Sequence, residues 1–230
     1  MPTDIPAILP SHVVIIPDGN RRWAKERKLL PFQGHTEGYA RANELITEAK
    51  RLGIEYLTLW AFSTENWNRS EDEVRQLLLL IERGLKELQT KIKGERARFV
   101  HLGRKDRLGE NITRLIEKLE EETKENNELT LCLAIDYGGE DEVTRALTLL
   151  GESSNPSSTL FDFLDTTINK IPSPDLIIRT SGEQRTSGFM PLQSLYSEWH
   201  FDSLHFPDFD IPAFHRALSS YSSRERRFGK

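Results

Sequence analysis

The stretch "HVVIIPDGNRRWAK", from His12 to Lys25, joins the end of a buried strand to a charged turn. Its first five residues form an almost continuous apolar run, which is typical of a strand covered on both faces in a parallel sheet. Asp18-Gly19-Asn20 then predicts a turn, and a turn with a helix-capping side chain explains the Asp and Asn without any ligand. A turn does not, however, require a carboxylate beside the two arginines that follow it. These charges raise the hypothesis that a ligand sits between them.

Five further segments have strand-like composition, and helical patterns separate them. Between the first two strands, apolar residues recur at three- and four-residue steps from Tyr39 to Leu52, and Gly53 ends that helix. Alternating strands and helices predict right-handed crossovers and an α/β fold. We expect a single domain over residues 1–230, with a mainly parallel six-stranded sheet flanked by helices and a flexible N-terminus at residues 1–11. The predicted strands are His12–Ile16, Glu55–Phe62, Ala97–Leu102, Leu129–Asp136, Asp175–Arg179 and a weaker one at Ser203–Phe206.

Composition narrows the class of protein. The net charge of −5 argues against a general nucleic-acid binder, which is usually basic. Cys132 is the single cysteine, so an intramolecular disulfide framework and a cysteine-rich zinc site are excluded. The first twelve residues lack the charged and apolar regions of a signal peptide, and no apolar run approaches the length of a membrane span. We therefore expect a cytoplasmic protein.

The helix that begins near Glu71 is more apolar than a surface helix. One apolar stripe runs along it from Val74 to Leu88, and Leu79 and Leu80 lie off that stripe, which makes the apolar face wide. A helix buried on several sides explains this pattern. The alternative explanation is an apolar cavity or a subunit interface against the second face.

The ends of the predicted strands carry the residues with the strongest chemistry. In open parallel sheets, ligands bind beyond the carboxyl ends of the strands. After the first strand, Gly19 permits close approach of the backbone to a phosphate. Asp18 can hold a Mg²⁺ ion that binds phosphate, and Arg22 can grip phosphate oxygens through two parallel hydrogen bonds.

Two later strand ends add hydroxyls and cations. "AFSTENWNR" offers Ser63, Thr64, Asn66 and Arg69. A capping box for the next helix would explain such polar residues without a ligand, but Ser70 with Glu73 is the better candidate for that cap. "LIIRTSGEQRTSG" places Arg179 and Arg185 around a Ser-Gly turn, and a solvated loop is the plain alternative to a diphosphate cradle there. Together these strand ends suggest two anionic sites and a metal beside an apolar helix, which suits a substrate with a diphosphate head and an apolar tail.

Several long motifs now stand in one order along the chain: "HVVIIPDGNRRWA", "GHTEG", "LTLWAFSTENWNR", "LAIDYGG", "DLIIRTSGEQRTSGF", "YSEWHF", "FPDF" and "RERRFG". On these motifs the chain resembles the cis-prenyltransferases, the undecaprenyl diphosphate synthase family, from His12 to Gly229. The resemblance implies condensation of isopentenyl diphosphate with an allylic diphosphate such as farnesyl or geranyl diphosphate. It further implies a new cis double bond, a Z-polyprenyl diphosphate product, a Mg²⁺ requirement, a homodimer and an apolar tunnel in the fold. An enzyme that releases such a product is also expected to contact a membrane peripherally.

The resemblance assigns expected roles by position. Asp18 matches the metal-binding aspartate, and Glu198 matches an acidic residue that assists Mg²⁺. Ser63 and Asn66 match residues that help to position or deprotonate substrate, so with Asp18 they are the expected catalytic residues. Substrate-binding roles are expected for Gly19, Asn20, Arg22, Trp23 and His35 around the allylic diphosphate, and for Trp67 and Arg69 in the second motif. The isopentenyl diphosphate site is expected to contain Arg179, Arg185 and Ser187. The C-terminal Arg227 and Gly229 are expected to bind substrate too and to complete the site across the dimer.

The chain departs from the family pattern at a few positions. Many members have an arginine four residues before the histidine of "GH", where it contacts the allylic diphosphate, and this chain has Pro31 there. Arg21 supplies a compensating charge under one hypothesis, as do Arg27 or Lys28. Asp136 replaces the usual Asn before "YGG".

Two other functions compete with an active elongating enzyme. One is a non-catalytic partner subunit of a heteromeric cis-prenyltransferase, although such partners usually lack the aspartate that Asp18 matches. The other is a Mg²⁺-dependent phosphatase that uses Asp18 as nucleophile, which leaves the apolar helix unexplained. Ala61 is small where a bulky residue would close the tunnel, and this favours a medium or long product.

Overall fold

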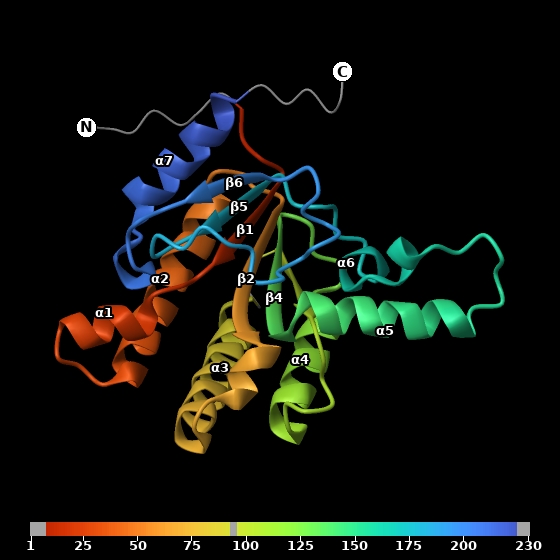
Figure 1. Cartoon of the computed structure of the whole chain (residues 1–230), viewed down its shortest axis with the longest axis horizontal. Coiled ribbons are helices and arrows are strands. Elements are labelled where there is room, and N and C mark those ends of the chain that lie inside the picture. The colour runs from red at the N-terminus through yellow and green to blue at the C-terminus, as the bar shows by residue number, and fades with distance from the viewer. Residues whose placement is uncertain (1–7, 93–95, 225–230) are drawn as a thin grey trace.

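The sheet consists of six parallel strands. A computed structural model describes residues 8–92 and 96–224, and every structural statement below concerns these residues. The strand order is β3-β4-β2-β1-β5-β6, and each pair of neighbours is parallel (Figure 1). The predicted α/β fold with a six-stranded sheet is confirmed. The strands are β1 (His12–Ile16), β2 (Tyr56–Ser63), β3 (Ala97–Leu102), β4 (Leu129–Tyr137), β5 (Leu176–Arg179) and β6 (Glu198–Phe201).

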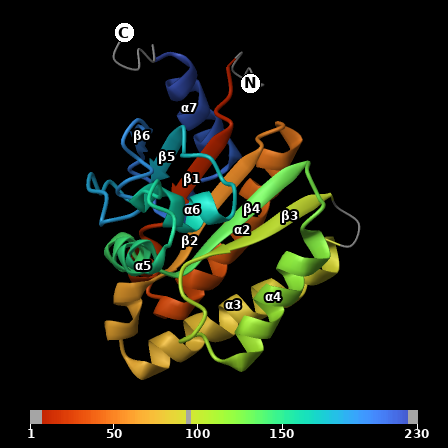
Figure 2. The same ribbon diagram turned by 90° about the vertical axis from the view of Figure 1, so that its right-hand side faces the viewer.

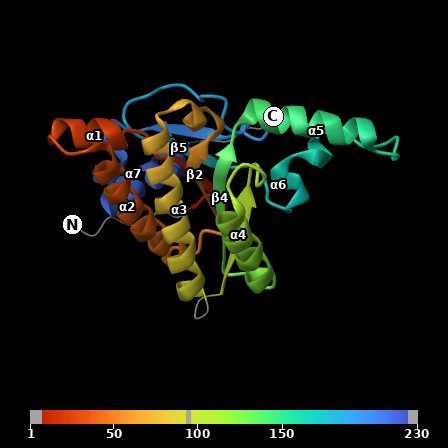
Figure 3. The ribbon, with the colours of Figure 1, turned by 90° about the horizontal axis from the view of Figure 1, so that it is seen from below.

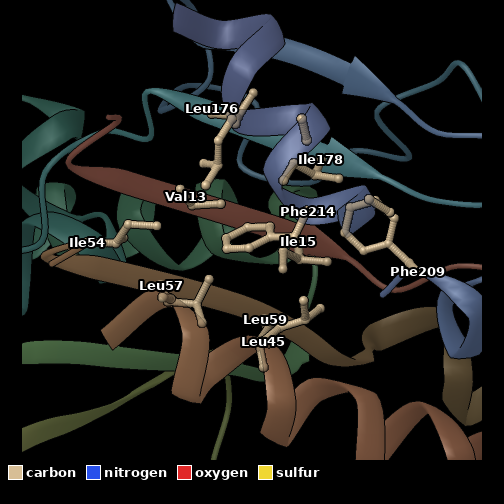
Figure 4. Packing of buried hydrophobic residues seen from close by; sticks show 14 of the residues in the cluster. Val13, Ile15, Leu45, Ile54, Leu57, Leu59, Leu176, Ile178, Phe209 and Phe214 are labelled. Carbon is tan, nitrogen blue, oxygen red and sulfur yellow. The ribbon is translucent and has the colours of Figure 1, made fainter. Parts of the chain in front are cut away.

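Both faces of the sheet are covered, one by helices and the other largely by the loop residues Ile171, Phe189 and Met190, which explains the continuous apolar runs. Val13 and Ile15 of β1 belong to one buried cluster, whereas Val14 and Ile16 belong to another on the opposite face. The first cluster includes apolar side chains of α2 and α7 (Figure 4). Since both faces of β1 are covered, all five of its residues are buried. The helices are α1 (Asn20–Glu26), α2 (Pro31–Arg51), α3 (Glu71–Ile92), α4 (Glu110–Thr123), α5 (Gly139–Glu152), α6 (Asp165–Ile168) and α7 (Ile211–Ser222), with short 3₁₀ helices η1 (Thr64–Asn68), η2 (Leu160–Phe163) and η3 (Phe206–Asp208).

The sixth strand was predicted at the wrong place. Ser203–Phe206 is a connection into η3, and the strand lies earlier, at Glu198–Phe201. β6 is an edge strand with only one neighbour, and its residues alternate between polar and aromatic and remain partly exposed. It therefore lacks the continuous apolar run by which the other strands are recognised. The expected flexible N-terminus at 1–11 falls largely outside the described residues.

α3 and α4 pack side by side beneath β2, β3 and β4 (Figure 2). Leu77, Leu80 and Ile81 of α3 line an apolar cavity of about 140 Å³ that α2, β2 and β4 close on the other sides. Leu78 instead lines an outer groove, and Leu79 is 58% exposed. The cavity explanation for the wide apolar face is thus correct for Leu80, whereas Leu79 faces away from the cavity.

A close contact between α1 and α2 fixes the turn after β1. A Cβ atom added to Gly34 of α2 would lie 2.1 Å from the backbone oxygen of Asn20, the first residue of α1. We expect Gly34→Ala to lower the free energy of unfolding by about 2–3 kcal/mol, because backbone must move to relieve the overlap. Gly151→Ala is the matched control, since no atom lies within 4 Å of its added Cβ and alanine favours a helix. Urea unfolding of both variants checks this, and equal midpoints would contradict it.

Candidate active site

Asp18 and Arg179 meet at the centre of the sheet. Asp18 follows β1 and Arg179 ends β5, and these two strands are neighbours, so both side chains lie at the carboxyl edge of the sheet. One Asp18 oxygen accepts a hydrogen bond from Arg179 Nη2 at 2.9 Å, and the other accepts from Arg22 Nη2 at 3.1 Å. The Arg179 side chain is only 5% exposed. The sequence raised the hypothesis that a ligand sits between Asp18 and the arginines; in this structure the carboxylate contacts Arg22 and Arg179 directly, so the ligand stays a prediction.

These ion pairs control the charge of Asp18. Burial alone would raise the pKa of its carboxyl, but the hydrogen bonds and charges of Arg179 and Arg22 outweigh burial and lower the pKa below its ordinary value. Asp18 is thus ionised at neutral pH. It is a carboxylate held between two guanidinium groups, which themselves remain able to bind a second anion.

The loop after β5 folds around the Arg179 side chain. Arg179 Nη1 donates to the Ser187 hydroxyl at 2.8 Å and to the backbone oxygen of Arg185, whereas the buried Nε atom has no hydrogen-bond partner. Ser187 adopts a φ of 49°, a conformation that non-glycine residues rarely take. The structure thus brings the predicted residues Arg179, Arg185 and Ser187 together and leaves the Arg179 Nε–H unused.

Glu183 joins two arginines and was not predicted. Its carboxylate accepts from Arg22 Nη1 at 2.7 Å and also pairs with Arg185. Because one carboxylate reaches both guanidinium groups, Arg22 and Arg185 lie close together on either side of Glu183. Glu183 could have been singled out from the motif "SGEQR", because an acidic residue stands there between residues predicted to bind anions.

A basic pocket of about 690 Å³ opens beside Asp18. It holds five basic side chains and a single carboxylate, in contrast with the net charge of −5 for the whole chain. Of the predicted residues it contains Asp18, Gly19, Asn20, Arg22, His35 and Arg69; its other lining residues are Pro17, Arg21, Lys25, Lys28, Leu29 and Pro31. A concentration of cations in a largely acidic protein indicates an anionic ligand. Lys25 was not predicted.

Gly19 is required for the turn at this pocket. Its φ is 101°, and an added Cβ would lie 2.5 Å from the Ser181 hydroxyl and 2.6 Å from His205 Nδ1. Both the backbone conformation and the lack of space exclude any larger residue. Gly19 thereby allows the chain to turn sharply from β1 into α1, which places Arg22 over Asp18.

Two buried polar atoms at the junction of the basic pocket and the apolar cavity lack partners. They are Asn20 Oδ1 and His35 Nε2, and both residues line both spaces. Burial and then the nearby Arg69 lower the pKa of His35 to about 4, so its ring is neutral at pH 7. Buried polar groups normally have partners, so unsatisfied atoms here are consistent with a ligand that crosses the junction.

Two other predicted residues, Trp23 and Trp67, make contacts within the protein, and their substrate-binding roles stay predictions. The Trp23 indole N–H donates to Asp208 at 2.8 Å, so it fastens α1 to η3 and does not line the basic pocket. The Trp67 indole N–H donates to the buried carboxylate of Asp136 at 2.8 Å, and Asp136 also pairs with Arg107. This pair accounts for the departure from Asn at position 136, because Arg107 neutralises the extra charge.

The rest of the second motif lies at the end of β2. The Asn66 side chain accepts a hydrogen bond from the Ser63 backbone N–H at 3.1 Å, so it caps η1. Neither residue lines the basic pocket. Their catalytic roles stay predictions. Arg227 and Gly229 lie outside the described residues.

The fit of a Mg²⁺ ion rests on Asp18. The described residues contain no group of three or more His, Cys, Asp or Glu side chains that could hold a metal. Mg²⁺ commonly binds one or two carboxylates together with substrate phosphates and water, so a single Asp18 beside an anion pocket fits that pattern. Glu198 does not join it within one chain: it begins β6, at the opposite end from the carboxyl edge, and pairs with Arg224. Its metal role stays a prediction that needs a second chain.

An anion site built around Asp18 and two arginines lies next to an apolar cavity, an arrangement that suits a ligand with a diphosphate head and an apolar tail. A family model described as putative undecaprenyl diphosphate synthase matches residues 16–229, and the chain belongs to this family of prenyltransferases. It is 42% identical to the isoprenyl transferase of Fusobacterium nucleatum over 221 residues, which cover 96% of each chain. The isoprenyl transferase of Aquifex aeolicus is also 42% identical, with 96% of each chain covered.

Solved structures agree with this assignment. Lavandulyl diphosphate synthase from Lavandula x intermedia, in complex with dimethylallyl diphosphate, superimposes with a TM-score of 0.91 at 35% identity, covering 96% of this chain and 99% of that one. A probable undecaprenyl diphosphate synthase from Campylobacter jejuni gives 0.81 at 30% identity, with the same coverage. The family resemblance seen in the motifs is confirmed.

Proposed function

We propose that this prenyltransferase condenses isopentenyl diphosphate with an allylic diphosphate, such as farnesyl or geranyl diphosphate, to give a Z-polyprenyl diphosphate. The observation that carries the proposal is the placement of Asp18 between Arg179 and Arg22, beside the apolar cavity. Arg179, Arg185 and Ser187 hold the isopentenyl diphosphate. Gly19, Arg22 and the basic pocket hold the allylic diphosphate, whose tail enters the cavity.

The charges of the site suit the bond changes of this reaction. The allylic C–O bond breaks, its electrons leave with the diphosphate, and the allylic carbon becomes electron-poor. The double bond of isopentenyl diphosphate supplies the electrons for the new C–C bond, and a proton leaves the isopentenyl unit. Arg22 and the neighbouring cations stabilise the leaving diphosphate most strongly as its charge grows. A Mg²⁺ ion on Asp18 would neutralise diphosphate oxygens in the same way.

The metal requirement is directly testable. We expect EDTA to abolish elongation and added Mg²⁺ to restore it, because Mg²⁺ is commonly held by one or two carboxylates together with substrate phosphate oxygens, and Asp18 stands beside the anion pocket. The assay measures transfer of labelled isopentenyl diphosphate into solvent-extractable product. Elongation at the full rate in EDTA would contradict the metal proposal.

The same assay separates the competing functions. Chain growth from farnesyl diphosphate supports elongation. Unchanged substrates support a non-catalytic partner subunit, and release of phosphate without growth supports a phosphatase. Asp18, Arg22 and Arg179 are all present and engaged with one another, which favours elongation over the partner subunit.

Arg21 provides a test of how the pocket compensates for Pro31. Its Nε atom lies 3.7 Å from Glu73, and its half-exposed side chain lines the basic pocket, whereas Arg27 is turned toward Trp23 and Asp208. We expect Arg21→Ala to raise KM for the allylic substrate about fivefold, the effect of one partly exposed charge worth about 1 kcal/mol. KM for isopentenyl diphosphate should not change. Arg27→Ala is the control, and steady-state kinetics in which both variants keep the wild-type allylic KM would refute the hypothesis.

The product length is constrained by the cavity. Ala61 lines it, as expected for an enzyme with a medium or long product. A volume of about 140 Å³ is close to that of a cavity that accommodates benzene, so the present space suits roughly one five-carbon unit. Longer chains require α2 and α3 to separate. Tyr39 of α2 lies across Gly84 of α3 and is the side chain that such a movement would displace first.

A homodimer in the cytoplasm with peripheral membrane contact completes the proposal. The open edge of β6 and the exposed Leu195, Tyr196 and Phe201 near it support pairing with a second copy. No helix in the described part of the chain has the length and apolar character to cross a bilayer. The membrane contact would serve an enzyme that releases an apolar product.

A further inference from the structure

The connection between α1 and α2 exposes apolar and basic side chains together. Residues Lys25–Phe32, here called the α1–α2 tip, are all exposed, and they read KERKLLPF. Leu30 is 62% exposed, Phe32 43% and Leu29 37%. Three consecutive or near-consecutive large apolar side chains in water are unfavourable unless something covers them.

The exposure of these side chains is fixed by the backbone. The Leu29 N–H donates to the Ala24 oxygen at 2.9 Å, and the Lys28 N–H donates to the Lys25 oxygen at 3.1 Å, which closes the end of α1. The Leu30 N–H donates to the Gln33 side chain at 2.9 Å, which caps the start of α2. The tip is therefore a hydrogen-bonded turn that holds Leu29 and Leu30 outward.

The charges around the tip favour an anionic partner. Lys25 and Lys28 have no carboxylate within 4.0 Å among the described residues. Glu26, the one acidic residue of the tip, pairs with His205 and Arg27, and Arg27 also pairs with Asp208. Two lysines without a carboxylate partner among the described residues thus precede the apolar side chains within the same tip.

The tip projects from the molecule, so it can contact a partner surface without interference from distant charges. It projects from one end of the molecule, opposite the end formed by α5 (Figure 3). Exposed charges more than about 10 Å apart are largely screened at physiological ionic strength, so the net charge of −5 on the whole chain does not cancel the local attraction. Lys25, Lys28 and Leu29 also line the basic pocket, so the tip borders the mouth of the active site.

We propose that the α1–α2 tip is a membrane-docking surface that inserts Leu29, Leu30 and Phe32 into the interface of an anionic lipid bilayer. Peripheral binding requires both apolar insertion and attraction to anionic lipid, and the tip provides the two signals within eight residues. A tip docked in this way would turn the active-site pocket toward the bilayer, which receives the apolar product. Delivery of the product to the bilayer rests on the proposed function, whereas binding of the tip to the bilayer does not.

Vesicle sedimentation without substrates tests this proposal. The purified full chain is mixed with vesicles of equal parts phosphatidylglycerol and phosphatidylcholine, or of phosphatidylcholine alone. We expect binding to the anionic vesicles, at least tenfold weaker binding to the neutral ones, and loss of binding in about 0.5 M salt. Absence of binding to anionic vesicles would overturn the proposal, whatever the outcome of the elongation assay.

Two double variants locate the surface. Leu30→Ser with Phe32→Ser should weaken vesicle binding at least tenfold while elongation of a short, water-soluble allylic diphosphate continues, because neither side chain lines the basic pocket or the cavity. Leu147→Ser with Phe161→Ser, which are 54% and 49% exposed on α5 and η2, should bind vesicles as the wild type does. Equal binding by the two variants would overturn the location.

Size-exclusion chromatography distinguishes a lipid surface from an interface between copies. The Leu30→Ser/Phe32→Ser variant should elute as the wild type does, and a change in its oligomeric state would assign the tip to a protein interface instead. Leu30→Asp alone provides an independent variant if the double substitution does not fold. It should also lose binding at least tenfold, and full binding would contradict insertion.

Discussion

Asp18→Asn is expected to lower the rate of elongation about a thousandfold. Asparagine keeps the size of the side chain but removes the negative charge to which Arg179 and Arg22 donate, and it removes the expected Mg²⁺ ligand. Loss of a single preorganised electrostatic contact in an active site commonly costs 10²–10³-fold in rate, and loss of a metal ligand adds to that. Single-turnover assays at saturating substrate measure the effect. Asp106→Asn is the control, because Asp106 pairs with Arg104 at the same edge of the sheet but lies outside the basic pocket.

The same substitution should reduce stability in a pH-dependent way. It leaves the nearly buried guanidinium of Arg179 without its anionic partner, a change that typically costs about 3–5 kcal/mol. Because the folded-state pKa of Asp18 is lowered, its stabilising contribution is present above the unfolded pKa of about 4 and is lost as pH falls through the folded value. The difference in unfolding free energy between wild type and variant should therefore shrink below about pH 4. If Asp18→Asn elongated at the wild-type rate, Asp18 would have no role in the mechanism.

Arg179→Lys is expected to raise KM for isopentenyl diphosphate about a hundredfold. Lysine keeps the charge opposite Asp18, so the protein should remain folded, but an ammonium group cannot bond to Asp18, Ser187 and a diphosphate through one planar fork. The measurement is KM for each substrate at saturating concentration of the other. The allylic KM should change much less.

Arg185→Lys is the matched comparison. The Arg185 side chain is 62% exposed and is paired with Glu183, so the substitution should raise KM for isopentenyl diphosphate only about fivefold, as for one exposed charge worth about 1 kcal/mol. Equal effects for the two arginines would contradict the inner position assigned to Arg179. An unchanged KM in Arg179→Lys would show that the isopentenyl diphosphate binds elsewhere.

Some parts of the site could be predicted from the sequence because parallel strands are recognisable and their carboxyl ends share one edge of the sheet. Val13 to Ile16 are apolar at every position because both faces of β1 are covered, and this pattern identifies the strand. Residues that follow parallel strands share one edge of the sheet, so Asp18 and Arg179 could be assigned to the same edge. That β1 and β5 are neighbours is a long-range pairing, which no local pattern encodes.

The one strand that was misplaced has an equally specific cause: β6 is an edge strand with one covered side and lacks the continuous apolar run. The sequence also does not reveal where two predicted residues lie. Trp23 follows the diphosphate turn, and helical geometry directs its indole to Asp208 on the other side of α1. Glu198 pairs with the start of β5, at the end of the strands opposite the carboxyl edge. The roles predicted for both residues remain predictions.

Simultaneous binding of two diphosphates is the central claim, and calorimetric titration tests it most directly. The wild-type chain is saturated in Mg²⁺ buffer with a non-reacting thiolo analogue of farnesyl diphosphate, and the corresponding analogue of isopentenyl diphosphate is then titrated in. We predict that one equivalent of each binds per chain at the same time, and that Arg179→Lys weakens only the second. Displacement of the first analogue by the second would show a single shared anion site and would contradict the account.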